Sequence, residues 1–110
     1  MTFIDTGTLE AKTVREGWTG RFFHSAQMTF AYYAVDAGAS IHEHRHANDE
    51  VWNVLSGALA ITVAGITQVV GPGGAVVVPP DTLHSIRAVS QSVVIVVDQP
   101  RRIAIGGVAL

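Results

Sequence analysis

Short apolar segments recur along the whole chain and are separated by residues that favour turns. Residues 59–63 show the pattern most plainly, because large apolar side chains alternate there with the smaller Ala60 and Thr62. Few windows repeat apolar residues at the three- and four-residue spacing of an amphipathic helix, so no helix is predicted. The expected strands cover residues 27–35, 50–55, 59–63, 67–70, 75–78, 83–89 and 92–97.

Many short strands divided by frequent turns are typical of an all-β sandwich or barrel. Residues 93–97 are apolar at every position, so one face of this strand can fill the barrel and the other needs a cover. The N-terminal segment, the tail from Arg101 to Leu110 or a second copy of the chain could supply that cover. We therefore expect a single domain over residues 1–110 that forms a homodimer.

Composition narrows the possible partners and chemistry. The chain has 110 residues, of which 48% are apolar and 15% charged, with a formal net charge of -2. No basic run suggests nucleic acid, and no apolar run approaches a membrane span, so neither partner is expected. Residues 1–10 lack the apolar segment of a secretory signal, which makes a cytoplasmic location the expectation. The absence of cysteine excludes disulfides, thiolate ligands and a cysteine nucleophile.

A cluster of histidines carries the strongest chemical signal. His42, His44 and His46 occupy alternate positions, so they point the same way if the segment is extended. Glu50 follows a short turn, and His84 begins another expected strand just after a Pro-Pro-Asp turn. Three imidazoles and one carboxylate suit a divalent transition metal: Fe, Mn, Ni, Cu, Co or Zn. Taken alone, the His-Glu-His-Arg-His run could equally be a solvated turn.

The spacing around these residues resembles the first motif of the cupin superfamily. Five residues separate Gly38 from His44, one separates His44 from His46, three separate His46 from Glu50 and six separate Glu50 from Gly57. The segment from Gly73 through Pro79 to His84 resembles the second cupin motif.

Two positions in the second segment depart from the family pattern. Asp81 stands where the family usually has Gly, and Ala88 stands where it often has Asn. Asp can adopt the left-handed backbone conformation that a Gly turn uses. The Asn is not a metal ligand in the family, so the departures affect the choice of subfamily more than the metal site.

The resemblance implies a small jelly-roll barrel, the RmlC-like double-stranded β-helix, with one metal inside it near one end. His44, His46, Glu50 and His84 are then the expected metal ligands, and Glu50 also the expected proton acceptor. The family includes dioxygenases, isomerases, lyases, decarboxylases, cyclases, storage proteins and sensory domains, so the resemblance does not select a reaction.

Strand parity suggests which other side chains share the pocket. Trp52 has the parity of Glu50, and Ile86 that of His84, so both should face inward. The expected pocket residues are His42, Trp52, Tyr32, Phe30 and Ile86. His24 is a weaker candidate for the same pocket. On this reading the pocket is mostly apolar, with no second carboxylate and no inward Lys or Arg that the sequence can place.

Three functions from different classes remain open. The expected function is that of a metal-dependent dioxygenase acting on a small apolar or aromatic compound, which fits the complete ligand set in an apolar cavity. A metal-assisted lyase, decarboxylase, isomerase or cyclase would work without oxygen. A barrel that binds or senses a small molecule without turning it over fits the lack of an evident acid–base pair.

Overall fold

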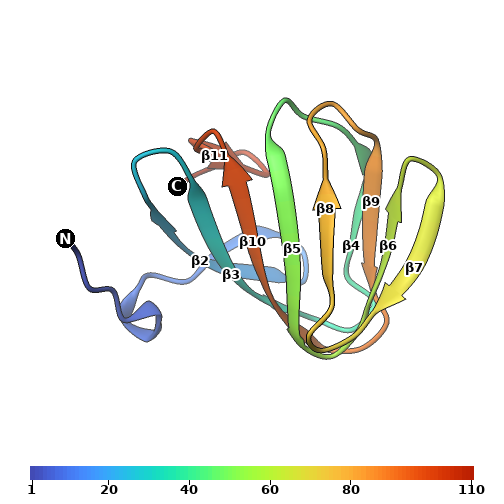
Figure 1. Ribbon diagram of the computed structural model, residues 1–110. Helices are drawn as coiled ribbons and strands as arrows, with labels where there is room; N and C mark the ends of the chain where they lie inside the picture. The colour runs from blue at the N-terminus through green and yellow to red at the C-terminus, as the bar shows by residue number, and fades with distance from the viewer.

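Two antiparallel sheets face each other in the computed structural model, which describes residues 1–110 (Figure 1). The larger sheet has the strand order β1-β2-β3-β10-β5-β8 and the smaller one β4-β9-β6-β7. The strands are β1 (Lys12–Arg15), β2 (Trp18–His24), β3 (Thr29–Val35), β4 (Ser40–His44), β5 (Asp49–Ser56), β6 (Leu59–Val63), β7 (Ile66–Val70), β8 (Ala75–Val78), β9 (His84–Ala88) and β10 (Ser92–Gln99). A 3₁₀ turn, η1 (Thr6–Thr8), precedes them, and a hairpin of β11 (Ala104–Ile105) and β12 (Val108–Ala109) follows. The fold is the all-β jelly roll that the sequence predicts.

The predicted strands correspond closely to the observed ones. Residues 59–63 and 75–78 are β6 and β8 as expected, and most other boundaries differ by one or two residues. The apolar pattern alone does not delimit β1, β2 or β4. Strand β10 continues two residues past the predicted end at Val97, and this extension brings Asp98 into the barrel wall. No helix of the chain is long and apolar enough to cross a membrane.

The core lies between the inner faces of the two sheets. In β10 the side chains alternate, so that Val94, Val96 and Asp98 are buried while their neighbours are half-buried on the outer face. Trp18 is fully buried and meets Tyr33 and Trp52 edge-on, with ring centroids 5.6 and 5.8 Å apart. Edge-to-face contacts of this kind add to the stabilisation from burial.

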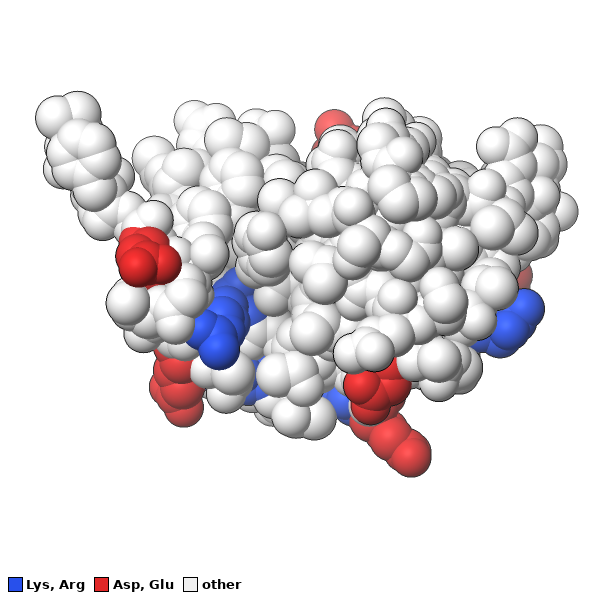
Figure 2. All heavy atoms as spheres, turned by 90° about the horizontal axis from the view of Figure 1, so that it is seen from below, with Lys and Arg blue, Asp and Glu red and all other residues white.

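The outer face of the larger sheet keeps much of its apolar surface. The N-terminal segment is held at its edge by hydrogen bonds from Arg21 to the carbonyl groups of Thr6 and Gly7, and it leaves Phe3 87% exposed. The C-terminal tail does not cover this face either, because Ile105 packs into the core instead. Seen from below, most charged side chains of this face lie along one border, and wide areas elsewhere in the view are uncharged (Figure 2).

Gly57 shows why a glycine is needed at the end of the first motif. Its φ is +80°, and a Cβ there would lie 2.3 Å from both the Gln91 carbonyl oxygen and the Ser92 Oγ. Gly65 has a φ of +81° with nothing within 4 Å of the same position. Both positions therefore require a residue that tolerates a positive φ, and only at Gly57 would a Cβ atom also clash with neighbouring atoms.

We expect Gly57→Ala to lower the free energy of unfolding by about 2–4 kcal/mol and Gly65→Ala by about 1 kcal/mol. Both variants place an L side chain at positive φ, whereas only the first must displace the Gln91–Ser92 backbone. Urea unfolding followed by circular dichroism measures both losses. Equal losses would show that the contact at Gly57 has no energetic weight.

Candidate metal centre

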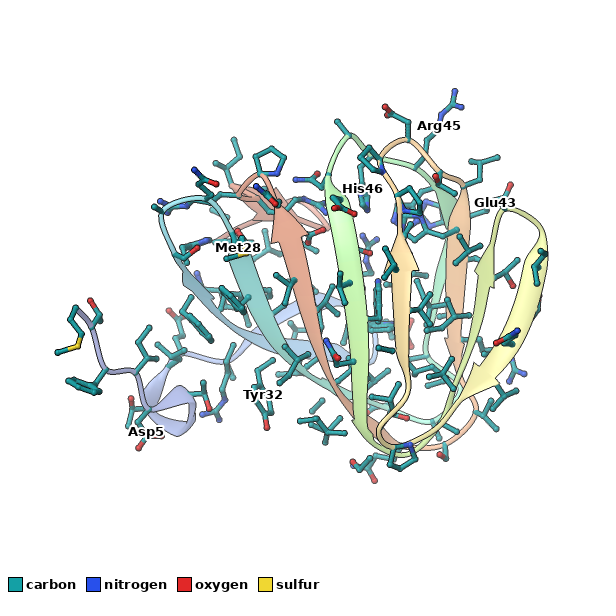
Figure 3. The ribbon with its side chains drawn as sticks, in the orientation of Figure 1. Asp5, Met28, Tyr32, Glu43, Arg45 and His46 are labelled. Carbon is teal, nitrogen blue, oxygen red and sulfur yellow. The ribbon has the colours of Figure 1, made fainter.

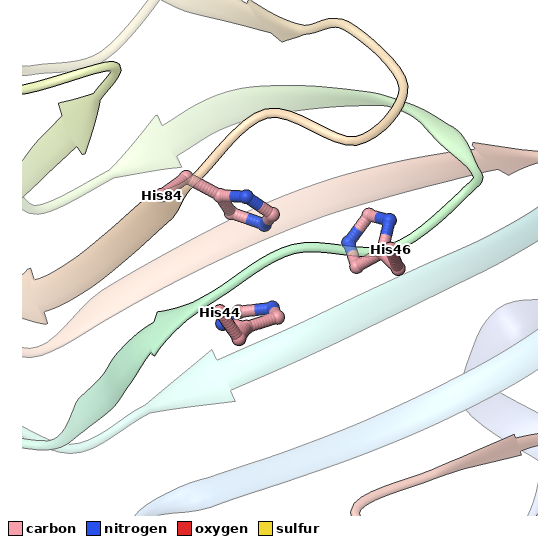
Figure 4. A group of neighbouring side chains, drawn as sticks. All are labelled: His44, His46 and His84. Carbon is pink, nitrogen blue, oxygen red and sulfur yellow. The ribbon is translucent and has the colours of Figure 1, made fainter.

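Three histidines from two neighbouring strands and one loop meet at one end of the barrel. His44 is the last residue of β4 and lies opposite His84, the first residue of β9, in the pairing of those strands. His46 follows β4 in the loop that leads to β5. The ring centroids are 4.3 Å apart for His44 and His84, 5.5 Å for His44 and His46, and 4.9 Å for His46 and His84. Figure 4 shows the three rings around a common space.

Backbone carbonyl groups fix the orientation of two of these rings. The Nδ1 of His44 lies 2.8 Å from the carbonyl oxygen of His42, and the Nδ1 of His84 lies 2.8 Å from that of Thr82. A ring that donates its Nδ1–H in this way presents the lone pair of Nε2 to the opposite side. The Nε2 of His84 is buried and has no hydrogen-bond partner.

Glu50 completes the group from the larger sheet. It is the second residue of β5 and is 4% exposed. Its Oε2 lies 3.3 Å from the Nε2 of His46, and its Oε1 lies 3.4 Å from the Nε2 of His84. Trp52 donates a hydrogen bond of 2.6 Å from its indole N–H to Oε1. The carboxylate is thus held between the two sheets.

These side chains fit a metal ion by their own chemistry. The ligand atoms of His44, His46 and His84 all lie within 4.8 Å of one another. Neither ring nitrogen of His46 makes a hydrogen bond, although both are buried. Buried polar atoms without partners are costly, and a shared cation would satisfy several of them at once. The cluster could therefore hold a divalent metal, as the sequence predicts.

The surroundings shift the pKa values of the group in opposite directions. Burial lowers the pKa of His44. Burial also acts to lower that of His84, but the Glu50 carboxylate and the Thr82 carbonyl raise it overall. Burial acts to raise the pKa of Glu50, yet the polar groups of His46, His84, Asp98 and Trp52 around it lower it well below its usual range. Glu50 is consequently an anion at neutral pH.

Asp98 is a second buried carboxyl that the sequence interpretation missed. It lies opposite Glu50 in the pairing of β10 with β5, and its ligand atom is within 4.8 Å of those of Glu50 and His46. It is 2% exposed, and its Oδ1 has no hydrogen-bond partner. Burial and the adjacent Glu50 carboxylate raise the pKa of Asp98 to about 9. The expectation that no second carboxylate faces inward was wrong.

Two arginines also reach the interior, which the sequence could not place. The Nη1 of Arg102 lies 3.8 Å from Oε2 of Glu50 and 3.6 Å from Oδ2 of Asp98. Arg15, at the end of β1, and Arg102 both line a small cavity beside the histidines. The free volume of this cavity is about 30 Å³, which suits a small polar group better than an aromatic ring. The cavity is lined by Val14, Arg15, Trp18, Tyr33, Ile41, His44, Glu50, Trp52, Val96, Asp98, Arg102 and Ile105.

Two of the predicted pocket residues lie on the wrong face. Tyr32 and Phe30 belong to the outer face of β3, whereas Tyr33 is 5% exposed and lines the cavity. Figure 3 shows Tyr32 pointing away from the barrel interior. Phe30 stacks on Phe23 with ring centroids 4.8 Å apart. Both faces of β3 carry apolar residues, so hydrophobicity alone does not show which face points inward.

The other predicted pocket residues divide between the cavity and its surroundings. Trp52 lines the cavity, as expected. Ile86 is buried in the general core and does not line the cavity. His42 is exposed on β4, and His24 binds the Thr29 hydroxyl outside the cavity. In Figure 3, His46 lies at the upper end of the barrel and Arg45 points beyond it.

Residues 31–99 match the family model of the cupin domain. The chain belongs to the cupin family. The SCO3923 protein of Streptomyces coelicolor is 37% identical over 94 residues, which cover 84% of this cupin and 90% of that protein. The structure of KdgF from Halomonas sp. superposes with a TM-score of 0.87 and 27% identity, covering 93% of this chain and 96% of that one.

An RmlC-like cupin from Shewanella frigidimarina also superposes with a TM-score of 0.87, at 21% identity and with 93% of each chain covered. Identity at that level shows the fold alone.

One departure of this cupin from the family pattern has a structural explanation. Asp81 has a φ of +57°, so it adopts the left-handed conformation expected of a residue that replaces Gly. Its backbone N–H donates a 2.7 Å hydrogen bond to the carbonyl oxygen of His46. The turn before β9 is thereby joined to the loop that carries one of the histidines.

Proposed function

We propose that His44, His46, His84 and Glu50 bind one divalent transition metal, with the histidines using their Nε2 atoms. The observation that supports this assignment is the convergence of unpartnered histidine nitrogens on a buried carboxylate. The carbonyl contacts to Nδ1 of His44 and His84 set their tautomers for this role.

We further propose that the protein is a metal-dependent enzyme that moves a proton without using oxygen, as a lyase, isomerase, decarboxylase or cyclase does. A metal held by these residues would polarise a carbonyl or hydroxyl oxygen of the substrate as a Lewis acid. Asp98 supplies the acid–base group that such chemistry needs, because its neutral carboxyl faces the cavity with Oδ1 free to give or take a proton.

The residues around Asp98 keep the two carboxyls in different states. Trp52 donates to Glu50 alone, whereas Arg102 contacts both carboxyls and acts to lower the pKa of Asp98, which burial and the Glu50 carboxylate nevertheless raise. Two carboxyls this close do not both ionise readily, so Glu50 carries the charge and Asp98 retains the proton. Pairs of carboxyls with divergent pKa values are a common arrangement for acid–base catalysis.

A dioxygenase, the function that the sequence favours, is the second candidate because a set of histidines and one carboxylate also suits iron. The small volume of the cavity and the charged residues among its lining support this candidate less well, since the predicted substrate was apolar or aromatic. A barrel that only binds or senses a small molecule is the third, and the buried acid–base pair argues against it.

Solvent deuterium incorporation tests the proposed reaction class. The chain, loaded in turn with each of the candidate metals, is incubated without oxygen in D₂O with a panel of small carbonyl and hydroxyl compounds. We expect metal-dependent incorporation of deuterium at a carbon next to a carbonyl group, detected by mass spectrometry. Turnover that appears only when oxygen is admitted would favour the dioxygenase. Unchanged compounds that nevertheless bind would favour the binding barrel.

We also propose that the protein is a homodimer that joins the outer faces of two larger sheets. Val77 is 62% exposed and Leu55 44% exposed on this face, and the outer residues of β10 beside them are apolar. The N-terminal segment carries exposed Phe3 and Ile4 away from its own barrel (Figure 1). A two-fold contact between copies would cover both the face and the segment.

Charge placed on this face should dissociate the dimer. We expect Val77→Glu to be monomeric by light scattering after gel filtration, because a carboxylate buried in an apolar interface lacks a partner. Val69→Glu is the matched control, since Val69 is 66% exposed on β7 of the other sheet. A dimer that survives Val77→Glu but not Val69→Glu would place the interface on the smaller sheet.

A further inference from the structure

The cavity contains hydrogen-bond donors that no group of the protein satisfies. The indole N–H of Trp18 is buried without a partner, and so is the Nε of Arg15. Trp18 is fully buried, and the two residues face each other in the pairing of β1 with β2. The other indole of the cavity, Trp52, donates to Glu50. The β1–β2 side of the cavity therefore presents two unused donors.

The two arginines of the cavity differ in what they already bind. Arg102 lies within 4.0 Å of both Glu50 and Asp98, so the Glu50 anion already serves as its counter-ion. Arg15 has no carboxylate within that distance. A half-buried guanidinium with a buried Nε and no counter-ion, beside a second free donor, can receive an anion.

We propose that the cavity binds a small molecule through a carboxylate group, which the Arg15 guanidinium and the Trp18 indole N–H hold. This inference rests on the proposed function, in that the same cavity is the substrate site. The carboxylate would lie beside β1 and β2, which leaves the adjoining part of the molecule to reach His44, Glu50 and Asp98. The planar fork of Arg15 matches a carboxylate.

A phosphate is the other anion that a guanidinium recognises, and the cavity suits it less. It is larger than a carboxylate and carries more negative charge next to the Glu50 anion. The chemistry therefore favours a small carboxylic acid, such as a 2-oxo or 2-hydroxy acid, over a phosphate ester.

Binding of pyruvate, measured by calorimetry and by tryptophan fluorescence, tests the inference without any assay of turnover. Pyruvamide is the neutral isostere, and inorganic phosphate is the competing anion. Both tryptophans line the cavity, so occupancy should change the fluorescence. We expect saturable binding of pyruvate and weaker binding of the other two. Equal binding of pyruvamide, stronger binding of phosphate, or no saturable response to pyruvate would overturn the proposal.

Substitution of Arg15 locates the binding site. We expect Arg15→Met to weaken pyruvate binding about 10- to 100-fold, the range for loss of a charge-assisted hydrogen bond, and Arg15→Lys to restore part of it. Arg87→Met is the control, because Arg87 is exposed on the outer face of β9. Circular dichroism confirms that each variant is folded. Pyruvate binding that is unchanged in Arg15→Met would overturn the proposal.

Repeating the titrations after chelation separates this inference from the proposed function. Binding that needs Arg15 and persists in chelated protein supports the carboxylate site even if no metal enzyme is found. Binding that is lost on chelation and unchanged in Arg15→Met would assign the carboxylate to the metal, which rejects the Arg15 site and leaves the proposed function intact.

Discussion

Replacing His84 by Ala is expected to abolish stoichiometric metal binding while the barrel remains folded. His84 presents a buried Nε2 to the centre of the cluster, 3.4 Å from Glu50, and its orientation is fixed by the Thr82 carbonyl. Loss of a residue that only supports a metal ligand weakens binding about 10- to 100-fold, so loss of a ligand should exceed that range. The strands do not depend on this side chain, because the core between the sheets is formed by apolar residues.

His42→Ala is the matched control for this prediction. His42 belongs to the same histidine-rich segment, and its ring centroid is 5.9 Å from that of His44, yet its side chain is exposed. Elemental mass spectrometry of the two purified variants and the unmodified chain gives the metal content. We expect about one ion per chain in His42→Ala and none in His84→Ala. Full metal content in His84→Ala would reject the proposed ligand set.

The fold was predictable because its main determinants are local in the sequence. Alternation of apolar residues and breaks such as residues 71–74 identify the strands and turns, and β6 and β8 have the predicted bounds. The spacing of the histidines and Glu50 likewise follows from local structure. Strand β4, the following loop and the start of β5 bring His44, His46 and Glu50 together within seven residues. Only His84 comes from a distant part of the chain.

The lining of the cavity was harder to predict because both faces of the larger sheet are apolar. In β3, Phe30 and Tyr32 are as hydrophobic as the inward residues, so the alternation gives no direction. The outer face retains this character, which is the same feature that supports a homodimer. The burial of Tyr33 opposite Gly20 depends on packing between strands, which a single-sequence pattern does not contain.

The polar residues of the cavity were missed for two different reasons. Asp98 continues the inward parity of Val94 and Val96, so extending the predicted strand by one residue would have found it. Arg15 and Arg102 come from segments without a clear apolar period, and only the tertiary structure brings them to the cavity. Strand boundaries and loop paths are the least certain results of pattern analysis, and here they carried the acid–base and charge chemistry.

Asp98→Asn is expected to slow the proposed reaction by about 10²- to 10⁴-fold without loss of the metal. Asn keeps the shape and size of the side chain but cannot give or take the proton that Asp98 holds at neutral pH, where its raised pKa of about 9 keeps it neutral. Asn can still donate a hydrogen bond to Glu50, so the position of that carboxylate should change little. The rate of metal-dependent deuterium incorporation measures the effect, together with the metal content of the variant.

Asp49→Asn provides the control that separates proton transfer from a general loss of negative charge. Asp49 directly precedes Glu50 in β5 and lies opposite Gln99, the residue after Asp98 in β10. The Asp49 side chain, however, is exposed. We expect Asp49→Asn to keep the rate of the unmodified chain. An equal loss in both variants would indicate that the charge of this end of the barrel matters, and not the proton on Asp98. An unchanged rate in Asp98→Asn would assign proton transfer to another group of the cavity. Tyr33 is then the alternative proton donor, because it lines the cavity and burial raises the pKa of its hydroxyl, which keeps the proton on it.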